Sequence, residues 1–445
     1  MAEAGAKIVI VTGGSLGDMH PFAALAHALR TEGLRPVIAT MEYYRDYLAS
    51  EGLDFTPIRP DLDDMLTRLG EDLNGVARRM EADDRYLFHD MIFPALRESY
   101  ADLYKACEGA VAVVVHGIGF AGRAAAEKRR LPFVNIVMSP LFLPSIYDPP
   151  VGMLTPYIPA PKTALARLRN RILRKATEFA WPFWAAPWEK FRRELGLPKR
   201  RGGDFFSISP GAAATIALYS PLLAPRQADH PDNMRIAGFT FHDRHRNEGD
   251  EVLPALEAFL AAGDAPIIVT LGSFFARNRV AQYAAYADAA RRLGKRAVLL
   301  VNADDLAKAK ALAAEDVFVA SYVPHSRVFP RASIIVHHGG SGTTGQALRA
   351  GKPQLVTPLM GDQPDNGARL ARLGVARVAK AGASAERLAQ ELQELLTNQL
   401  YAQRALEAAR IVAAEDGAAV AARMIAEIAH KETRHESLAV LGDAI

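Results

Sequence analysis

The sequence predicts an α/β protein made of two Rossmann-like, doubly wound domains, and three observations carry this prediction. A short β-branched run at residues 7–12 ends in Gly13-Gly14 and is followed by a helical pattern. The same strand–turn–helix order begins again after residue 260. Between the halves, the polar stretch 242–250 has almost nothing to bury, which is typical of a linker. Strands that alternate with helices in this way predict parallel sheets with helices on both faces.

The elements of the first half follow from the period of its apolar residues. Residues 21–30 predict a helix, because Phe22, Leu25 and Leu29 share one face and Gly33 follows as a stop signal. Runs rich in valine and isoleucine predict buried parallel strands at residues 7–12, 36–40, 112–116 and 133–137.

The second half repeats the pattern. A strand at 266–271 is turned by Gly272-Ser273, and an alanine-rich helix follows at about 281–293. Ser384 is a good N-cap for a helical stretch that continues to about His430. Further strands are predicted at residues 297–301, 317–320, 333–336 and 354–357.

These elements divide the chain. We place an N-terminal domain at 1–241, a linker at 242–255, a C-terminal domain at 256–430 and a tail at 431–445, with the option that the final helix packs back on the N-terminal domain. The linker histidines, His242 and His245, are expected to be solvated.

Composition excludes several classes of protein. The 445 residues carry a net charge of only +3, which does not favour nucleic acid as a partner. The single cysteine, Cys107, excludes an internal disulfide and a cysteine-cluster metal site. No run approaches 18 apolar residues, and the N-terminus lacks the pattern of a signal peptide. We therefore expect a cytoplasmic protein, with peripheral contact at the inner membrane surface left open.

The strongest chemical signal is the run His337-His-Gly-Gly-Ser-Gly-Thr-Thr344, between a predicted strand and a predicted helix. Glycines let the backbone approach a ligand closely, and the first N–H groups of the helix point at it. This arrangement suits an anion such as phosphate. The alternative is an ordinary glycine-rich turn.

The surrounding residues favour a ligand site. Tyr322-Val-Pro-His325 precedes the run, and Gly351-Lys-Pro353 and Pro358-Leu-Met-Gly-Asp-Gln363 follow it. Together these residues resemble the donor-binding segment of family 1 glycosyltransferases, which include the UDP-glycosyltransferases. The chain looks most similar to the bacterial branches that glycosylate sterols, macrolides and rhamnolipid precursors. The resemblance implies the GT-B fold, with two Rossmann-like domains facing across a cleft, inversion at the anomeric carbon, and no bound metal or other cofactor.

The resemblance also implies a role for each matching residue. Tyr322 would stack on the nucleotide base, and Val323 would meet the base edge through its backbone. Ser273 would reach the phosphates from the opposite side. Gln346, where plant members have glutamate, would bind the ribose without a charge. The diphosphate and sugar contacts would come from the remaining donor-site residues, namely His325, His338, Gly340, Ser341, Gly342, Thr343, Asp362 and Gln363.

A second site is expected in Gly13-Gly-Ser-Leu-Gly-Asp-Met-His-Pro21. Many members of the resembled family carry a catalytic histidine where Asp18 stands here, and several bacterial branches have aspartate. Transfer to a hydroxyl needs a general base, and an ionised carboxylate can serve. His20 is the second candidate for the base, and His116 at a strand end is expected to assist on the acceptor side. Asp18 could instead only cap the following helix.

Residues 162–200 combine many basic residues with all three tryptophans of the chain. We expect Trp181 and Trp184 to help bind a hydrophobic acceptor, while Pro182 and Pro187 are expected to break the segment into short helices. A basic, aromatic helix could also lie on a membrane surface, or the segment could be a packed helical hairpin.

Two weaker patterns point to other functions. Thr12-Gly-Gly-Ser-Leu-Gly17 resembles the dinucleotide loop of short-chain dehydrogenases, but no Tyr-x-x-x-Lys accompanies it. Asp61-Leu-Asp63 matches the Asp-x-Asp of metal-dependent glycosyltransferases, although Asp61 more simply opens a helix.

The sequence thus predicts a glycosyltransferase that moves a hexose from a nucleoside-diphosphate sugar to a hydroxyl of an apolar small-molecule or lipid-like acceptor. UDP-glucose is the favoured donor and dTDP-rhamnose is next. The alternative is a non-catalytic nucleotide-sugar-binding protein of the same fold.

Overall fold

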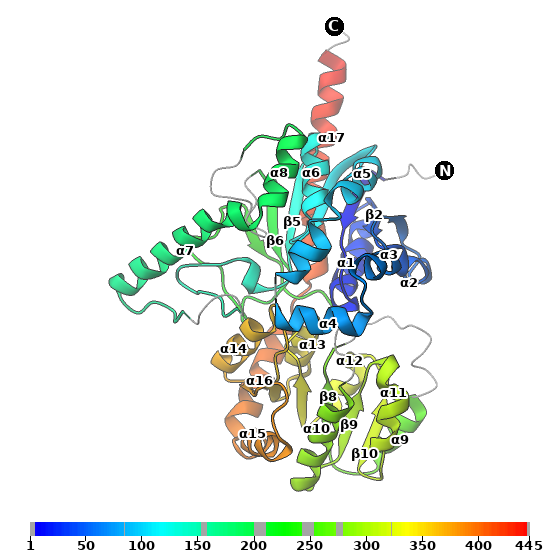
Figure 1. Ribbon diagram of the computed structural model, residues 1–445, viewed down its shortest axis with the longest axis vertical. Coiled ribbons are helices and arrows are strands. Elements are labelled where there is room, and N and C mark those ends of the chain that lie inside the picture. The colour runs from blue at the N-terminus through cyan, green and yellow to red at the C-terminus, as the bar shows by residue number, and fades with distance from the viewer. Residues whose placement is uncertain are drawn as a thin grey trace.

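The computed structural model describes residues 5–83, 85–152, 158–199, 211–242, 253–272, 279–321 and 323–442. Within these ranges, two parallel sheets lie one beyond the other along the long axis of the molecule, each with helices packed on it (Figure 1). The expected class, two Rossmann-like α/β domains, is therefore confirmed.

The N-terminal sheet has the strand order β3-β2-β1-β4-β5-β6-β7, and its neighbouring strands pair in parallel. The order reverses between β1 and β4, which is where ligands bind in open α/β sheets. The strands are β1 (Lys7–Val11), β2 (Arg35–Thr40), β3 (Asp54–Pro57), β4 (Ala110–His116), β5 (Phe133–Val137), β6 (Ala214–Ala217) and β7 (Met234–Ile236).

The helices of the N-terminal half include two that differ from the sequence prediction. The first begins at Leu16, one turn before the expected start at Pro21, because Ser15 and Asp18 form a capping box there. Another runs through Pro182 and ends only at Trp184, so the expected break at that proline is wrong. The helices are α1 (Leu16–Thr31), α2 (Arg45–Ser50), α3 (Leu62–Leu69), α4 (Leu73–Ala82), α5 (Leu96–Ala106), α6 (Phe120–Lys128), α7 (Ala164–Trp184) and α8 (Ala186–Glu194).

The C-terminal sheet has the strand order β10-β9-β8-β11-β12-β13, again with parallel neighbours. Its strands are β8 (Ile267–Thr270), β9 (Ala297–Leu300), β10 (Val317–Ala320), β11 (Ile334–His337), β12 (Gln354–Val356) and β13 (Ala376–Val378). The helices of this half are α9 (Leu253–Ala261), α10 (Val280–Arg292), α11 (Ala303–Ala309), α12 (His325–Val328), α13 (Ser341–Ala350), α14 (Gln363–Leu373), α15 (Ala385–Thr397), α16 (Gln399–Val412) and α17 (Gly417–Gly442).

The last helix, α17, packs on α1 and β4 of the N-terminal domain (Figure 1). Its buried small side chains, among them Ala421, Ala422 and Ala426, lie in one hydrophobic cluster with Ile8 and Val114. Alanines permit this close approach of a helix to a sheet. The two ends of the chain are thereby joined in one core.

The domain limits drawn from the sequence stay a prediction. Most of the predicted linker, residues 243–252, lies outside the described residues, and α9 begins at Leu253. In the described part of the chain, no helix is both long and apolar enough to cross a membrane.

Candidate active site

A cavity of about 1290 Å³ lies between the carboxyl ends of the two sheets. Its lining includes the turn after β1 (Gly13 and Gly14) and His116 at the end of β4. From the other domain come Gly272 after β8 and His338 after β11. The cavity therefore occupies the position at which doubly wound sheets bind ligands, and both domains form its walls.

Glycines shape the donor side around the ring of His338. A Cβ atom at Gly340 would lie 2.5 Å from Nε2 of His338, and one at Gly272 would lie 3.2 Å from its Cε1. Burial lowers the pKa of His338 to about 3, with further lowering by His337 and His325. The imidazole is therefore neutral at pH 7 and carries one N–H, and a hydrogen bond to the backbone of Thr270 partly offsets the lowering of its pKa.

His337 fixes the turn that precedes α13. Its Nδ1 accepts a hydrogen bond of 3.1 Å from the N–H of Gly339, so its Nε2 donates to Oε1 of Gln354 at 3.0 Å. Gly339 has a φ of +93°, which favours glycine. The buried ring thus holds the backbone at the point where it turns toward the cavity.

The amino end of α13 is open toward a ligand. Its N-cap is Gly340, and no side chain caps the first turn. Ser341, Gly342 and Thr343 line the cavity there. Uncapped N–H groups at the positive end of a helix dipole attract an anion. The turn therefore has backbone donors that suit an anion, and the anion site stays a prediction.

Asp362 is held at the start of α14 by two donors. The hydroxyl of Ser341 donates to its Oδ2 at 2.8 Å, and Nδ2 of Asn366 donates to the same oxygen at 2.9 Å. Burial raises the pKa of Asp362 to about 6, and the negative charge of Asp18 raises it further. A carboxylate of the N-terminal domain therefore acts on the carboxyl group of Asp362 across the cleft.

Four further residues of the expected donor site line the cavity. Oε1 of Gln363 accepts hydrogen bonds from the N–H groups of Leu359 and Met360, at 2.7 and 3.1 Å, which leaves its NH₂ group as the donor for a ligand. Gln346, Val323 and His325 line the cavity. The ring of His325 stacks on Phe329.

The expected donor site has two more members, on which the structure gives no information. Ser273 and Tyr322 lie outside the described residues.

Asp18 stands at the opposite wall, in the first turn of α1. Its Oδ2 accepts hydrogen bonds from the N–H of Ser15 at 2.8 Å and from the Ser15 hydroxyl at 3.1 Å. Its Oδ1 lies 3.9 Å from Nε2 of His116. One oxygen therefore caps the helix, while Oδ1 accepts no hydrogen bond from the described residues, and Asp18 as a residue lines the cavity. The capping interpretation and the general-base interpretation are compatible, because they use different oxygens.

The histidines near Asp18 differ in their surroundings. Burial lowers the pKa of His116, whose ring packs edge-on against Phe22. His20 also lines the cavity, and its ring packs against Tyr47 and His242.

The expectation that His242 is solvated is wrong. Its side chain is 8% exposed, and its Nε2 lies 3.2 Å from Oε2 of the buried Glu51. The sequence shows no sign of this contact, because Glu51 is distant in the chain. His245 lies outside the described residues.

Apolar side chains line the part of the cavity where the sequence predicts an acceptor. Trp181 and Trp184 line it and stack on each other with ring centroids 4.9 Å apart, whereas Trp188 is buried in the core behind them. Phe88 packs edge-on against Trp184. Five methionines of the N-terminal domain complete this wall, namely Met41, Met65, Met80, Met91 and Met138. We call this surface the acceptor wall.

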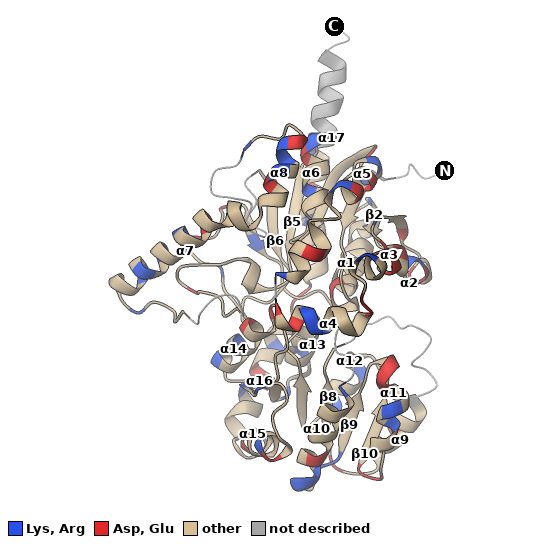
Figure 2. Ribbon diagram, viewed as in Figure 1, with Lys and Arg blue, Asp and Glu red and all other residues tan. Residues whose placement is uncertain are grey.

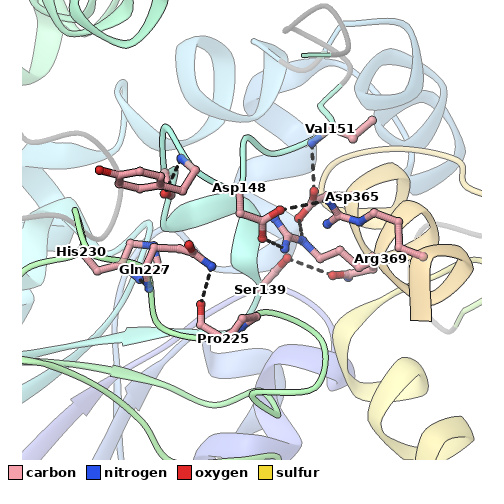
Figure 3. A network of polar contacts seen from close by, with 12 residues as sticks. Ser139, Asp148, Val151, Pro225, Gln227, His230, Asp365 and Arg369 are labelled. Atoms are coloured by element: carbon pink, nitrogen blue, oxygen red, sulfur yellow. Dashed lines mark hydrogen bonds and ion pairs between the residues drawn. The ribbon is translucent and has the colours of Figure 1, made fainter. Parts of the chain in front are cut away.

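An ion-pair network that the sequence did not predict connects the two domains (Figure 3). On α14, Arg369 pairs with Asp365 at 2.7 Å and also with Asp148 of the N-terminal domain. The N–H of Val151 donates to Oδ1 of Asp365 at 2.9 Å. Arg372 adds a second, more exposed pair to Asp148. We call these residues the interdomain latch; it holds the helix that begins beside Asp362.

Among the described residues, no group of three or more His, Cys, Asp or Glu side chains could hold a metal ion. Asp61 stands at the N-cap of α3, and its carboxylate accepts a hydrogen bond of 3.0 Å from the N–H of Tyr43. The Asp-x-Asp match is thus explained by local structure.

Comparison with known proteins identifies the family. Residues 8–130 match the glycosyltransferase family 28 N-terminal domain, and residues 285–428 match the C-terminal domain of erythromycin biosynthesis protein CIII-like proteins. The chain is 31% identical to O-mycaminosyltylonolide 6-deoxyallosyltransferase of Streptomyces fradiae, over 96% of this chain and 98% of that protein. It is 30% identical to vancomycin aglycone glucosyltransferase of Amycolatopsis orientalis, with the same two coverages.

The fold agrees with these matches. The crystal structure of glycosyltransferase VinC in complex with dTDP aligns over 96% of this chain and 100% of that one, with a TM-score of 0.65 and 19% identity. The chain belongs to the family 1 glycosyltransferases of the GT-B fold, as the sequence resemblance indicated, and it is a glycosyltransferase enzyme.

Proposed function

We propose that this enzyme transfers a hexose from a nucleoside-diphosphate sugar to a hydroxyl of an apolar small-molecule or lipid-like acceptor, with inversion. UDP-glucose is the first donor to test, and dTDP-rhamnose or another dTDP-sugar is next. One observation carries the proposal: a single cavity joins the open end of α13 to the acceptor wall, and Asp18 borders it.

Asp18 is the proposed general base. Its Oδ1 would take the proton of the acceptor hydroxyl while that oxygen attacks the anomeric carbon and the bond to the diphosphate breaks. The bond between Oδ2 and the N–H of Ser15 holds the carboxylate in place. His116, 3.9 Å behind Oδ1, limits the positions that the carboxylate can take.

The leaving diphosphate would be met by the C-terminal domain. Its growing charge faces the first N–H groups of α13 and the neutral imidazole of His338. Fixed donors of this kind stabilise developing negative charge without rearranging during the reaction. We therefore propose that the donor is bound without a divalent cation or other cofactor, and that activity survives addition of EDTA.

Asp362 and Gln363 would hold the sugar. A carboxylate fixed by Ser341 and Asn366 can accept hydrogen bonds from sugar hydroxyls, and the free NH₂ of Gln363 can donate one. Both residues lie at the junction of the two walls, where the transferred group must sit.

The acceptor class follows from the acceptor wall. Tryptophan rings and methionines contact apolar surface without demanding particular polar groups. The names of the two relatives describe transfer to O-mycaminosyltylonolide and to the vancomycin aglycone, and this supports a bulky organic acceptor here.

A donor panel tests the proposal. Melting temperature is measured with UDP-glucose, dTDP-glucose, dTDP-rhamnose and their nucleotides, because a ligand at 100 times its Kd stabilises the folded state by about 2.7 kcal/mol. The donor that raises the melting temperature most is then incubated with hydroxylated macrolactone and sterol acceptors. A product heavier by one hexose supports the proposal, and the absence of stabilisation by every nucleotide would exclude it.

A further inference from the structure

The helix α7 stands out from the body of the N-terminal domain, and most of its surface faces solvent (Figure 1). Of its 21 residues, only Asn170 and Trp181 are buried. Helices of soluble proteins usually bury their apolar side chains in the core. Several large apolar side chains of α7 are instead exposed.

Large apolar side chains form an exposed stripe along the outer side of α7. Phe179 and Phe183 are 75% and 73% exposed, and the stripe begins with Leu165 at 76%. The spacings of three, four and seven residues place all members on one side of the helix. We call this surface the outer stripe; it consists of Leu165, Leu168, Ile172, Phe179 and Phe183.

The opposite side of the same helix lines the active-site cavity. Trp181 and Trp184 belong to it, and so does Leu173. The helix thus has the apolar part of the cavity on one face, and on the other face a stripe of apolar side chains that the described residues leave exposed. Exposed apolar stripes of this size mark interaction surfaces.

Basic residues recur along α7, the helix that carries the outer stripe (Figure 2). The helix carries Arg167, Arg169, Arg171, Arg174 and Lys175, and its single acidic residue, Glu178, is paired with Arg174 and Lys175. Arg167 and Arg171 are exposed and make no ion pair with the described residues. Arg171 lies one helical turn from Leu168, and Arg167 lies one turn before Arg171, so long cationic side chains flank the stripe and complement a surface that is both apolar and anionic.

We propose that the outer stripe of α7 docks on an anionic phospholipid bilayer. The phenylalanines and leucines would enter the boundary between headgroups and acyl chains, while Arg167 and Arg171 would meet the lipid phosphates. A second copy of the chain is a poorer occupant, because its α7 would offer Arg167 and Arg171 no free carboxylate: its one acidic residue, Glu178, is already paired with Arg174 and Lys175. Docking would place the acceptor side of the cavity next to the lipid.

Flotation with vesicles tests this proposal without donor or acceptor, so its outcome does not depend on the proposed function. The full-length protein is mixed with phosphatidylcholine vesicles that contain or lack phosphatidylglycerol. We expect it to float with the anionic vesicles only, and high salt to release it.

The variants separate apolar contact from charge. The double variant Phe179→Ser, Phe183→Ser should weaken partitioning into vesicles by about 100-fold. The loss of apolar contact at each phenylalanine should weaken it by roughly tenfold. The double variant Arg167→Gln, Arg171→Gln should weaken it by about 30-fold, since each charge contributes about fivefold near such a surface. All four side chains are exposed, so both variants are expected to keep the melting temperature of the parent.

Matched controls come from α16 of the C-terminal domain. The double variant Leu400→Ser, Leu406→Ser removes two apolar side chains of about half exposure, and Arg410→Gln removes an exposed arginine. Neither should change flotation. The proposal is overturned if the parent does not float with anionic vesicles or if the α7 variants float equally well. It is also overturned if light scattering shows a dimer that Phe179→Ser, Phe183→Ser dissolves while vesicle binding is absent.

Discussion

The two walls of the cleft offer a ligand different kinds of contact. On the donor wall, Asp362 and His337 are each fixed by two hydrogen bonds, and glycines shape the space around His338. On the acceptor wall, contacts come from packed aromatic rings and methionines. A nucleotide sugar has a fixed pattern of charges and hydroxyls, so rigid hydrogen-bonding groups can bind it selectively. An apolar acceptor is bound mainly by complementary shape. Substitutions in the acceptor wall could therefore change which acceptor fits without altering the donor site.

The largest expected effect is on the reaction at the boundary between the walls. Asp18→Asn keeps an oxygen for the Ser15 N–H, so the helix cap survives, but it removes the proton acceptor. We expect the transfer rate to fall by about 10²- to 10⁴-fold. Donor affinity, measured by titration calorimetry, should barely change.

His20→Gln is the control for the base. It should affect transfer far less than Asp18→Asn. If Asp18→Asn transfers sugar at the parent rate, Asp18 is only a cap, and His20 becomes the next residue to test.

The next effect concerns the latch that joins the walls. Arg369→Met leaves the buried Asp365 without its cation, and breaking a buried pair costs about 3–5 kcal/mol of folding free energy. Donor affinity should fall as well, because the same helix begins beside Asp362. Arg372→Met is the matched control: this side chain is 47% exposed, and its pair with Asp148 should contribute less than about 1 kcal/mol. Equal destabilisation by both variants in urea unfolding would contradict a buried latch.

A smaller effect isolates the diphosphate contact. His338→Ala removes a hydrogen bond to a charged group, which contributes about 1.5–3 kcal/mol, so the affinity for UDP or dTDP should drop roughly 10- to 150-fold. Affinity for the free nucleoside should stay the same. Equal losses for nucleotide and nucleoside would show that His338 supports the fold and not the phosphates.

The pH dependence of donor binding tests the carboxyl group of Asp362. Its pKa is raised to about 6, so it is ionised above that pH and becomes protonated below it. A sugar hydroxyl donates to the ionised form, so the affinity for a nucleotide sugar should weaken by roughly tenfold between pH 7 and pH 5.

Two variants sharpen this test. Asp362→Asn should abolish the pH dependence of donor affinity. Asp18→Asn should move its midpoint to lower pH, because it removes the neighbouring negative charge. A midpoint that stays in place would argue against an electrostatic contact between the walls.

The smallest effect is expected on the acceptor wall. Trp184→Ala should raise the KM for the acceptor about fivefold, the equivalent of about 1 kcal/mol of apolar contact, and leave the KM for the donor unchanged. Phe183→Ser, one residue away on the outer stripe, should leave both unchanged. If both KM values stay the same in Trp184→Ala, Trp184 packs the core and does not bind acceptor.

The sequence predicted the parts of the fold whose causes are local. Runs such as Val113–Val115 and Ile334–Val336 are buried from both faces and contain apolar β-branched residues throughout, so their strands were found. Strands β7 (Met-Arg-Ile) and β13 (Ala-Arg-Val) are short and have an arginine at the centre, and β3 contains a proline, so they gave no clear pattern. Long-range pairing with a neighbouring strand creates them.

The residues of the site also fall into a group with local causes and a group that only the folded chain brings together. The glycine run before α13 and the Ser15–Asp18 capping box are encoded within a few residues. The latch joins Asp148 to Arg369, 221 residues apart, so only the folded chain reveals it. The same reason explains His242: its partner Glu51 comes from the other end of the domain.

Donor hydrolysis followed by proton NMR tests the central claim most directly, because it needs no acceptor and reports both turnover and stereochemistry. The α-linked nucleotide sugar that stabilises the protein most is supplied, with water as the acceptor, and the first sugar released is recorded before it mutarotates. A single displacement predicts the β-anomer, at a rate that Asp18→Asn lowers by at least about 100-fold. Release of the α-anomer would contradict direct displacement, and no release above the Asp18→Asn level would contradict transfer by this site.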